Sequence, residues 1–194
     1  WGLERGAKIL HLGSGAGHLV DSLRSCGFDA AGIECDRDAA FLTPAELNIY
    51  NIHGDYNHLP FEDCQFDAII ETGLYRTKRG DINKAISELY RVAKHGVILG
   101  SVTTDLTIDI IERFNLLENI ELLCSRWDWA ERLYTAGFVH PLFNSPRLGD
   151  AWRKVSALGV GPDRWYADSE SLMYCVFGRA KDTLPANLAM SHRP

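Results

Sequence analysis

Residues 8–19 read KILHLGSGAGHL, and this stretch decides the fold. Residues 8–12 predict a short β-strand, which the following glycines break. Residues 18–25 carry leucines four positions apart, which is typical of a helix, and Gly27 is a suitable residue to end it. A glycine-rich turn between a strand and a helix lets a ligand approach the backbone closely, because glycine adopts positive φ without a Cβ clash. The helix N-terminus beyond it offers N–H groups to polar or anionic ligand atoms.

Short apolar runs alternate with helical patterns along the rest of the chain, which is typical of an α/β fold with a mostly parallel sheet. Further strands are predicted at residues 29–34, 50–53, 66–71, 97–102, 138–143 and 172–177. Helices are predicted at residues 36–42, 81–93 and 126–136, and in part of 106–123. We therefore expect one domain over residues 1–181, with an insertion at 144–169, and a loose C-terminal tail at 182–194.

Two acidic residues stand at predicted strand ends, on the same edge of the sheet as the glycine turn. Glu34 ends the second strand, 21 residues after Gly13. An acid in this position of a doubly wound fold accepts hydrogen bonds from ribose hydroxyls. Asp55 follows the third strand, where a carboxylate can accept from an exocyclic amine such as that of adenine. Either acid alone would be an ordinary turn residue, but together with the glycine turn they favour a nucleoside site.

The glycine spacing separates the nucleotide-binding motifs from one another. The turn has the form GxGxG, with Gly13, Gly15 and Gly17. A dinucleotide fingerprint, GxGxxG, needs its third glycine at the position of His18. No Gly-Lys-Ser/Thr follows, which excludes a P-loop. A nicotinamide-dependent oxidoreductase is therefore disfavoured, although it stays a third alternative.

The order of these motifs resembles that of class I S-adenosylmethionine-dependent methyltransferases, especially the group called methyltransferase type 11. The resemblance covers residues 8–143 and 172–177. It rests on an ordered set of motifs: Gly13-Gly15-Gly17, Glu34, Gly54-Asp55, Leu59-Pro60-Phe61 and Phe66-Asp67. Residues 88–96 and 129–138 also resemble the family's lead into the fifth strand and its late helix. The resemblance implies a Rossmann-like three-layer sandwich, with a seven-stranded, mostly parallel sheet and an antiparallel last strand.

The same resemblance implies that S-adenosylmethionine is the cofactor and S-adenosylhomocysteine the product. The three glycines would cradle the methionine portion, Glu34 would bind the ribose, and Asp55 with Tyr56 would bind the adenine. Residues 71–75 would line the methyl-transfer site. The full set that we expect to bind the cofactor is Gly13, Ser14, Gly15, Gly17, Glu34, Cys35, Asp55, Tyr56, Glu71 and Thr72.

His11 departs from the family pattern, which usually has an acid two residues before the first glycine. An acid there helps to organise the glycine turn beneath the cofactor. We interpret His11 as a core histidine that hydrogen-bonds to backbone groups of the turn, in preference to a catalytic residue. Our hypothesis is that cofactor binding survives with His11 but is weaker than an acid would give.

No motif identifies the methyl acceptor or a general base. Candidates near the expected transfer site are Tyr75, His18 and His140, with Arg76 as an anchor for an anionic acceptor. Each of the three also has a purely structural interpretation, as a packing, helix-start or strand residue. The insertion at 144–169 mixes tryptophans with arginines and is interpreted either as a lid or acceptor wall or as a helix packed on the sheet.

Composition limits the class of protein. A net charge of -6 and a pI near 5.6 argue against a broad nucleic-acid surface, and no apolar run reaches the length of a membrane span. The five cysteines include no CxxC, which favours free thiols, no metal site and a cytoplasmic location. The chain begins at Trp1, and we expect that an upstream domain or a partner chain belongs to it.

The leading hypothesis is methyl transfer from S-adenosylmethionine to a small-molecule or glycan-type acceptor. The alternative is a non-catalytic domain that binds S-adenosylmethionine or S-adenosylhomocysteine, or serves as a scaffold within a longer protein. Fold alone does not separate the two, because function resides in the site. Turnover discriminates between them.

Overall fold

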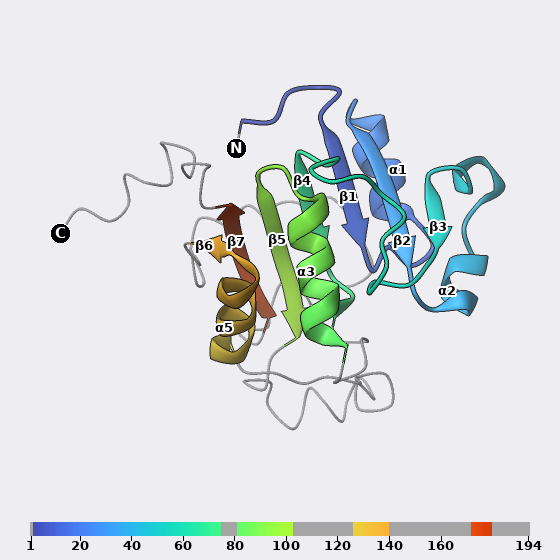
Figure 1. The fold of residues 1–194 in the computed structure, drawn as a ribbon. Coiled ribbons are helices and arrows are strands. Elements are labelled where there is room, and N and C mark those ends of the chain that lie inside the picture. Colours follow the sequence, from blue (N-terminus) through green and yellow to red (C-terminus); the bar gives the residue numbers. More distant parts are fainter. Residues whose placement is uncertain (1, 75–80, 103–125, 140–171, 180–194) are drawn as a thin grey trace.

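A seven-stranded sheet runs through the part of the chain that the computed structural model describes, residues 2–74, 81–102, 126–139 and 172–179 (Figure 1). Its strands are β1 (Lys8–Leu12), β2 (Asp29–Glu34), β3 (Asn51–His53), β4 (Ala68–Glu71), β5 (Gly96–Val102), β6 (Phe138–Val139) and β7 (Leu172–Arg179). They lie in the order β3-β2-β1-β4-β5-β7-β6. Strands β1 to β5 pair in parallel, and β7 is antiparallel to both β5 and β6. This confirms the predicted mostly parallel sheet with an antiparallel last strand.

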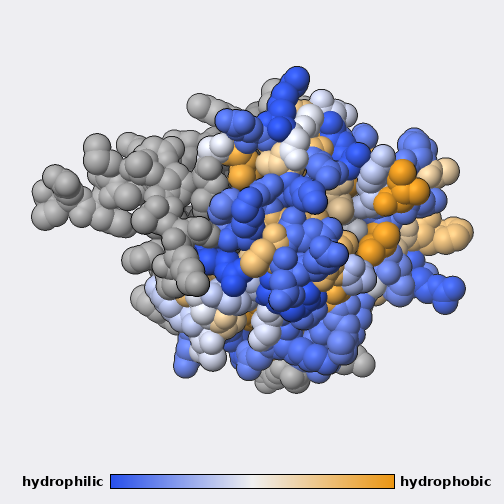
Figure 2. Space-filling view, turned by 45° about the horizontal axis from the view of Figure 1, so that its top comes forward, coloured by the Kyte–Doolittle hydropathy of each residue, from blue (hydrophilic) through white to orange (hydrophobic). Residues whose placement is uncertain are grey.

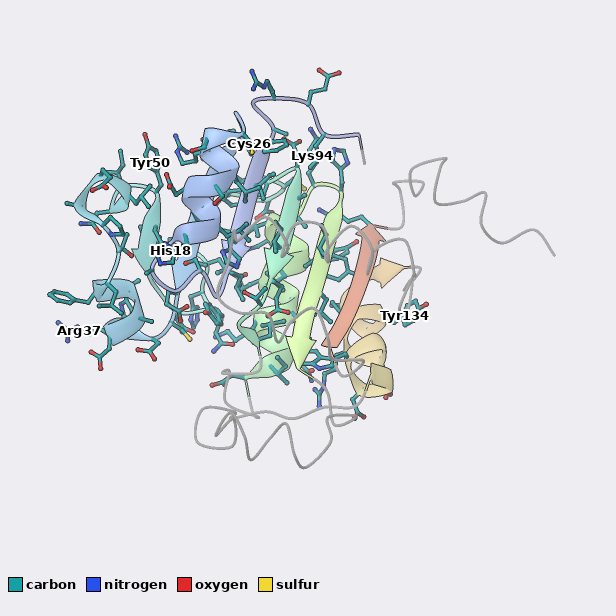
Figure 3. The ribbon with its side chains drawn as sticks, turned by 180° about the vertical axis from the view of Figure 1, so that it is seen from behind. His18, Cys26, Arg37, Tyr50, Lys94 and Tyr134 are labelled. Atoms are coloured by element: carbon teal, nitrogen blue, oxygen red, sulfur yellow. The ribbon has the colours of Figure 1, made fainter. Side chains whose placement is uncertain are left out.

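Helices cover both faces of this sheet. They are α1 (His18–Ser25), α2 (Arg37–Phe41), α3 (Ile82–Val92) and α5 (Arg126–Ala136), with a short 3-10 helix η1 (Ala45–Leu47) before β3. Helices α3 and α5 lie side by side in front of the sheet in Figure 1. Helix α1 lies on the opposite face, as the view from behind in Figure 3 shows. The arrangement is the three-layer sandwich that the sequence predicted.

The core is divided between these two faces. On the α3 and α5 side, Leu10 and Leu12 of β1 belong to the same buried cluster as Leu89 and Trp129. On the α1 side, Ile9 packs with Val20 in a second cluster. Successive side chains of a strand point to opposite faces, and residues 9–12 of β1 are all buried because helices cover the sheet on both sides. Each fully buried aliphatic side chain contributes about 2 kcal/mol to stability.

Several observed boundaries differ by a few residues from the prediction, and β4 shows why. The sequence predicts this strand from residue 66, but it begins at Ala68. Phe66 instead forms an isolated bridge with Ala93, and the Asp67 carboxylate accepts a hydrogen bond of 2.9 Å from the Lys8 N–H. Apolar pattern alone does not distinguish such an entry segment from the strand itself.

Other expectations fall outside the described residues. These are the helix within 106–123, the end of the strand at 138–143, the insertion at 144–169 and the tail at 182–194. Among the helices that the structure describes, none has both the length and the apolar character to cross a membrane. Within the same residues, no cluster of His, Cys, Asp and Glu side chains is arranged to hold a metal ion.

Large apolar side chains are exposed near the β3 edge of the sheet. Phe41, Leu42 and Ile49 are 86%, 71% and 76% exposed. Figure 2 shows apolar atoms at the right-hand end of its face, the side on which α2 and β3 lie. This end of the molecule therefore presents an apolar surface to solvent.

The carboxyl ends of β1 to β4 meet at one edge of the sheet and position the candidate site. Leu12, the last residue of β1, is in register with Ile33 of β2 and with Glu71 of β4. Glu34 of β2 is in register with His53 of β3. The residues that follow these strand ends therefore lie close together, as the sequence predicted.

Candidate functional site

The glycine loop, residues 13–17, connects β1 to α1 in a conformation that requires glycine. Gly13, Gly15 and Gly17 have φ values of 82°, 53° and 85°. The loop is anchored to β2, because the Gly13 and Ser14 N–H groups both donate to the Ile33 carbonyl, at 3.0 and 3.3 Å. Positive φ values of this kind are costly for residues with a Cβ, so the GxGxG spacing encodes the loop shape directly.

The first and second glycines of the loop have different surroundings. A Cβ at Gly13 would lie 2.5 Å from the backbone of Gly73, which follows β4. A Cβ at Gly15 would meet nothing within 4 Å. Gly13 therefore permits contact between two loops of the chain, whereas Gly15 presents an open backbone that a ligand can approach.

Glu34 is almost completely buried, at 1% exposure, and its carboxylate organises the site. Its Oε2 accepts a hydrogen bond of 2.8 Å from the Gly15 N–H. Its Oε1 accepts from the Asp36 N–H at 2.9 Å and from the Tyr56 hydroxyl at 3.3 Å. The glycine loop and the strand-end acid, which the sequence predicted to act together, are thus directly bonded.

Asn51, the first residue of β3, also holds the glycine loop and was missed in the sequence. Its side-chain amide donates to the Gly15 carbonyl at 2.9 Å and lies 2.7 Å from the Thr43 hydroxyl. The available signal was Gly32 in the middle of β2, since a glycine inside a strand often marks a close approach of another group. A Cβ on Gly32 would collide with the Asn51 side chain.

The two residues expected at the adenine lie in different environments. Asp55 is exposed, and its carboxylate accepts from the Asn57 N–H at 2.9 Å and pairs with His58 at 3.1 Å. These bonds, the Asn57 one first, hold the pKa of Asp55 below its usual range. Tyr56 is only 2% exposed, and burial, with the nearby Glu34 carboxylate, raises its phenol pKa far above the usual value.

This burial gives the Tyr56 side chain a supporting contact, and its expected role at the adenine stays a prediction. The hydroxyl donates to Glu34 and accepts from the Cys35 N–H at 3.3 Å, so the side chain supports the acid at the end of β2. The sequence motif does not reveal this, because a tyrosine after Gly-Asp fits a binding surface and a core equally well. Cys35 itself is half-buried and contributes its backbone to this network.

The segment after β4 contacts the glycine loop from the other side. Glu71 is fully buried, and its Oε1 accepts from the N–H groups of Gly73 and Leu74. The Thr72 hydroxyl donates to the Gly13 carbonyl at 3.2 Å and lies 2.9 Å from Nε2 of His11. Glu71 therefore shapes its own turn, while Thr72 joins the ends of β1 and β4.

His11 is buried, but it reaches the loop by a different route from the one expected. It contacts the Thr72 side chain and not the loop backbone, and its Nδ1 has no hydrogen-bond partner among the described residues. Because the Thr72 hydroxyl donates to Gly13, we assign the proton of neutral His11 to Nε2. Burial lowers the pKa of His11 to about 4, so the ring is neutral near pH 7.

The candidate catalytic residues are only partly placed by the structure. His18 is exposed at the N-terminal end of α1, next to the glycine loop (Figure 3). Tyr75, Arg76 and His140 lie outside the described residues. Of the three predicted catalytic candidates, the described part of the chain thus places His18 alone, at the margin of the binding framework.

Comparison with known proteins identifies this framework. Residues 9–96, which include every described residue of the site from Gly13 to Thr72, match a family model described as a methyltransferase domain. This segment matches the methyltransferase-domain family, in agreement with the resemblance of its motifs to class I S-adenosylmethionine-dependent methyltransferases. No curated protein sequence matches the chain.

The fold of the methyltransferase domain agrees with several solved structures. The PH0226 protein of Pyrococcus horikoshii OT3 has a TM-score of 0.64 at 17% identity, over 91% of this chain and 82% of that chain. The YcgJ protein of Bacillus subtilis has a TM-score of 0.57 at 18% identity, over 90% of each chain. At such identities the likeness demonstrates a shared fold.

A third structure similar to the methyltransferase domain contains ligands. The phosphoethanolamine N-methyltransferase 2 of Haemonchus contortus, bound to phosphomonomethylethanolamine and S-adenosylhomocysteine, has a TM-score of 0.60 at 16% identity. The match covers 93% of this chain and 50% of that enzyme. This chain therefore spans half the length of the ligand-bound relative.

The described residues of the methyltransferase domain fit S-adenosylmethionine, the cofactor of the family. The open left-handed backbone at Gly15 gives a ligand access to the loop, and the N-terminus of α1 follows it. Glu34 adds a carboxylate at the end of β2, where a ribose binds in doubly wound folds. Asp55 adds an exposed carboxylate at the end of β3.

Proposed function

We propose that the protein transfers a methyl group from S-adenosylmethionine to a small-molecule or glycan-type acceptor. The observation that carries this proposal is the 2.8 Å hydrogen bond between Glu34 and the Gly15 N–H. This hydrogen bond joins the acid expected to bind the ribose and the loop expected to bind the methionine portion in one site. The net charge of -6 favours a small acceptor over nucleic acid, and the Haemonchus contortus enzyme of similar fold binds a small phosphorylated amine.

In this proposal each strand end binds one part of the cofactor. The loop around Gly15 receives the methionine portion, Glu34 the ribose, and Asp55 the adenine amine. Tyr56 supports Glu34 from below, as its hydrogen bond to that carboxylate suggests. Glu71 and Thr72 fix the backbone that follows β4, beside the point where the methyl group would be transferred.

The chemistry asks mainly for alignment. The bound cofactor supplies a methyl group on a positively charged sulfur. A lone pair of the acceptor bonds to the methyl carbon as the carbon–sulfur bond breaks, and the sulfur keeps the electron pair of that bond. The protein must hold the acceptor in line and exclude water. A hydroxyl acceptor also needs a base, for which His18, Tyr75 and His140 stay the candidates, with Arg76 as an anchor for an anionic acceptor.

Calorimetric titration with S-adenosylmethionine, S-adenosylhomocysteine and NADH tests the proposal. We expect the two adenosyl compounds to bind and NADH not to bind, and we expect Glu34→Ala and Asp55→Ala to weaken binding. A screen of small amines, hydroxy compounds and glycans with labelled S-adenosylmethionine then identifies the acceptor. Cofactor binding without turnover on any acceptor would favour the non-catalytic alternative, and binding of NADH alone would contradict the proposed chemistry.

We also propose a cytoplasmic location. The cysteines whose side chains the structure describes, Cys26, Cys35 and Cys64, are free thiols, as is usual in reducing compartments. Cell fractionation tests this, and recovery of the protein outside the cytoplasm would contradict it.

A further inference from the structure

Asn51 occupies a position that is unusual for a polar side chain. It is the first residue of β3, in register with Gly32 of β2, and it is only 4% exposed. An amide is buried at a free-energy cost unless its groups are hydrogen-bonded. The partners of this amide therefore indicate why it is there.

Both hydrogens of the Asn51 amide nitrogen have acceptors nearby, whereas its Oδ1 has no hydrogen-bond partner among the described residues. Nδ2 lies 2.9 Å from the Gly15 carbonyl oxygen and 2.7 Å from the Thr43 hydroxyl oxygen. The Gly15 carbonyl can only accept, so the amide must turn its nitrogen toward it. The side chain thus connects β3 to the middle of the glycine loop, 36 residues earlier in the sequence.

Gly15 is consequently held at both of its backbone polar groups. Its N–H donates to Glu34 at the end of β2, and its carbonyl accepts from Asn51 at the start of β3. Its left-handed backbone has open space around it, so neighbouring side chains do not fix its conformation. These two hydrogen bonds therefore set the orientation of the Gly15 peptide groups.

Two glycines provide the space that Asn51 needs. A Cβ on Gly32 would collide with the amide, and a Cβ on Gly17 would lie 3.1 Å from its Cγ and Nδ2 atoms. The third glycine of the GxGxG motif thus has a second role, since it accommodates a side chain from β3. Loop, β2 and β3 fit together around this one amide.

We propose that Asn51 is a positioning residue for cofactor binding, which it serves by fixing the Gly15 backbone so that the open side of the loop faces the methionine portion of the ligand. The proposal rests on the proposed function, because it takes the loop to be the methionine site. Asn51 does not touch the ligand itself. Its loss therefore weakens ligands that engage the loop and leaves the adenosine portion largely unaffected.

The test compares Asn51→Ala and Asn51→Asp with Leu47→Ala in calorimetric titrations. Leu47 is buried just before β3, so its replacement destabilises the same region without removing a bond to the loop. Both Asn51 variants should lose roughly 10-fold in affinity for S-adenosylhomocysteine and less than about 2-fold for adenosine. Leu47→Ala should bind both ligands as the wild type does, although its Tm is lowered.

Amide hydrogen exchange of the ligand-free proteins provides a second measurement. Asn51→Ala should accelerate exchange of the Gly15 N–H at least about 10-fold while Leu10 in β1 exchanges as in the wild type. Equal S-adenosylhomocysteine affinity in wild type and Asn51→Ala, or an equal loss in Leu47→Ala, would overturn the proposal alone. Absence of adenosyl binding in the wild type would overturn the proposed function and this inference with it.

Discussion

The Nε2 atom of His11 lies 2.9 Å from the hydroxyl of Thr72, a residue 61 positions later in the chain. The Thr72 hydroxyl in turn donates to the Gly13 carbonyl. A neutral imidazole thus links the end of β1 to the segment after β4, at the position where related domains usually carry an acid. The loop is braced here by a side-chain relay that bears no charge.

Burial of His11 makes stability depend on pH. Its pKa is about 4 in the folded protein and near 6.5 when unfolded, so the unfolded chain binds more protons between these values. The contribution of neutral His11 to the free energy of unfolding is therefore fully present above pH 6.5. It decreases as the pH falls toward 4, by at most about 3 kcal/mol. Urea titrations at pH 7 and pH 5 measure this decrease.

The matched variant for that experiment is His11→Gln, whose amide can still reach Thr72 but does not titrate. It should lose clearly less stability between pH 7 and pH 5 than the wild type. Three carboxylates have lowered pKa values, and their contributions to stability are lost only at pH values below 5. They are Asp55, Asp67 and Glu88. Equal pH dependence in both proteins would refute the assignment to His11.

Replacing His11 by an acid tests its effect on the cofactor. We expect His11→Asp to bind S-adenosylmethionine several-fold more tightly than the wild type, roughly 1 kcal/mol, because a carboxylate can accept charge-assisted hydrogen bonds from loop donors, whereas Nε2 of the neutral ring donates to Thr72. Isothermal calorimetry at pH 7.5 measures the change. His11→Gln is the uncharged control, and unchanged or weaker binding by His11→Asp would show that the hypothesis is wrong.

Alanine substitutions at two glycines of one loop should differ in their effects on stability and on ligand binding. Gly13→Ala places a Cβ against the Gly73 backbone and should cost about 3 kcal/mol or more of folding stability. Gly15→Ala meets open space and should cost about 1 kcal/mol, while blocking ligand approach to the loop. Thermal unfolding and S-adenosylhomocysteine titration together measure both effects. The idea fails if Gly15→Ala binds normally or Gly13→Ala is as stable as the wild type.

The buried position of Tyr56 predicts a supporting role. Tyr56→Phe removes the hydroxyl that joins Glu34 and the Cys35 N–H, and should lower stability by about 1 kcal/mol with only a few-fold loss of cofactor affinity. Denaturant unfolding and calorimetry of the same sample measure the two quantities. A large affinity loss at unchanged stability would instead place the phenol against the ligand.

Tyr75 is expected to line the transfer site, since it follows β4 within a few residues. Tyr75→Ala should lower kcat at least about 10-fold once an acceptor is known, and Tyr75→Phe should lower it if the hydroxyl takes part. Single-turnover assays with saturating cofactor measure the change. Unchanged turnover in both variants would remove Tyr75 from the site.

Much of the fold could be predicted because its signals are local. The sequence placed β1, β2, α1 and α5 at their observed bounds. Gly27, with a φ of 91°, ends α1 as expected, and Gly137, with a φ of 107°, follows α5 in the same way. Each of these signals depends on residues within one element and its cap, so neighbouring sequence suffices to reveal them.

The sequence predicted which residues of the candidate site stand at or just after strand ends, but it did not predict the contacts that they make with distant residues. Gly15 and Glu34 follow from spacing, because parallel strands bring their carboxyl ends to one edge. Asn51 was missed, and Thr72 was predicted without its contacts to Gly13 and His11, because these contacts join residues 36 and 59 to 61 positions apart and no local pattern encodes them. The contact between Tyr56 and Glu34 was not foreseen for a related reason, since the direction in which an aromatic ring turns depends on packing from distant segments.

The backbone contact between Gly13 and Gly73 has a consequence for how this protein can change over generations. When a substitution adds a methyl group to a packed core, a second substitution to a smaller neighbouring side chain often restores stability. Here each glycine meets the main chain of the other, so neither partner has a side chain to shrink. A second substitution that compensates for a change at either position must therefore shift the backbone. Gradual sequence divergence at this pair of positions is restricted for that reason.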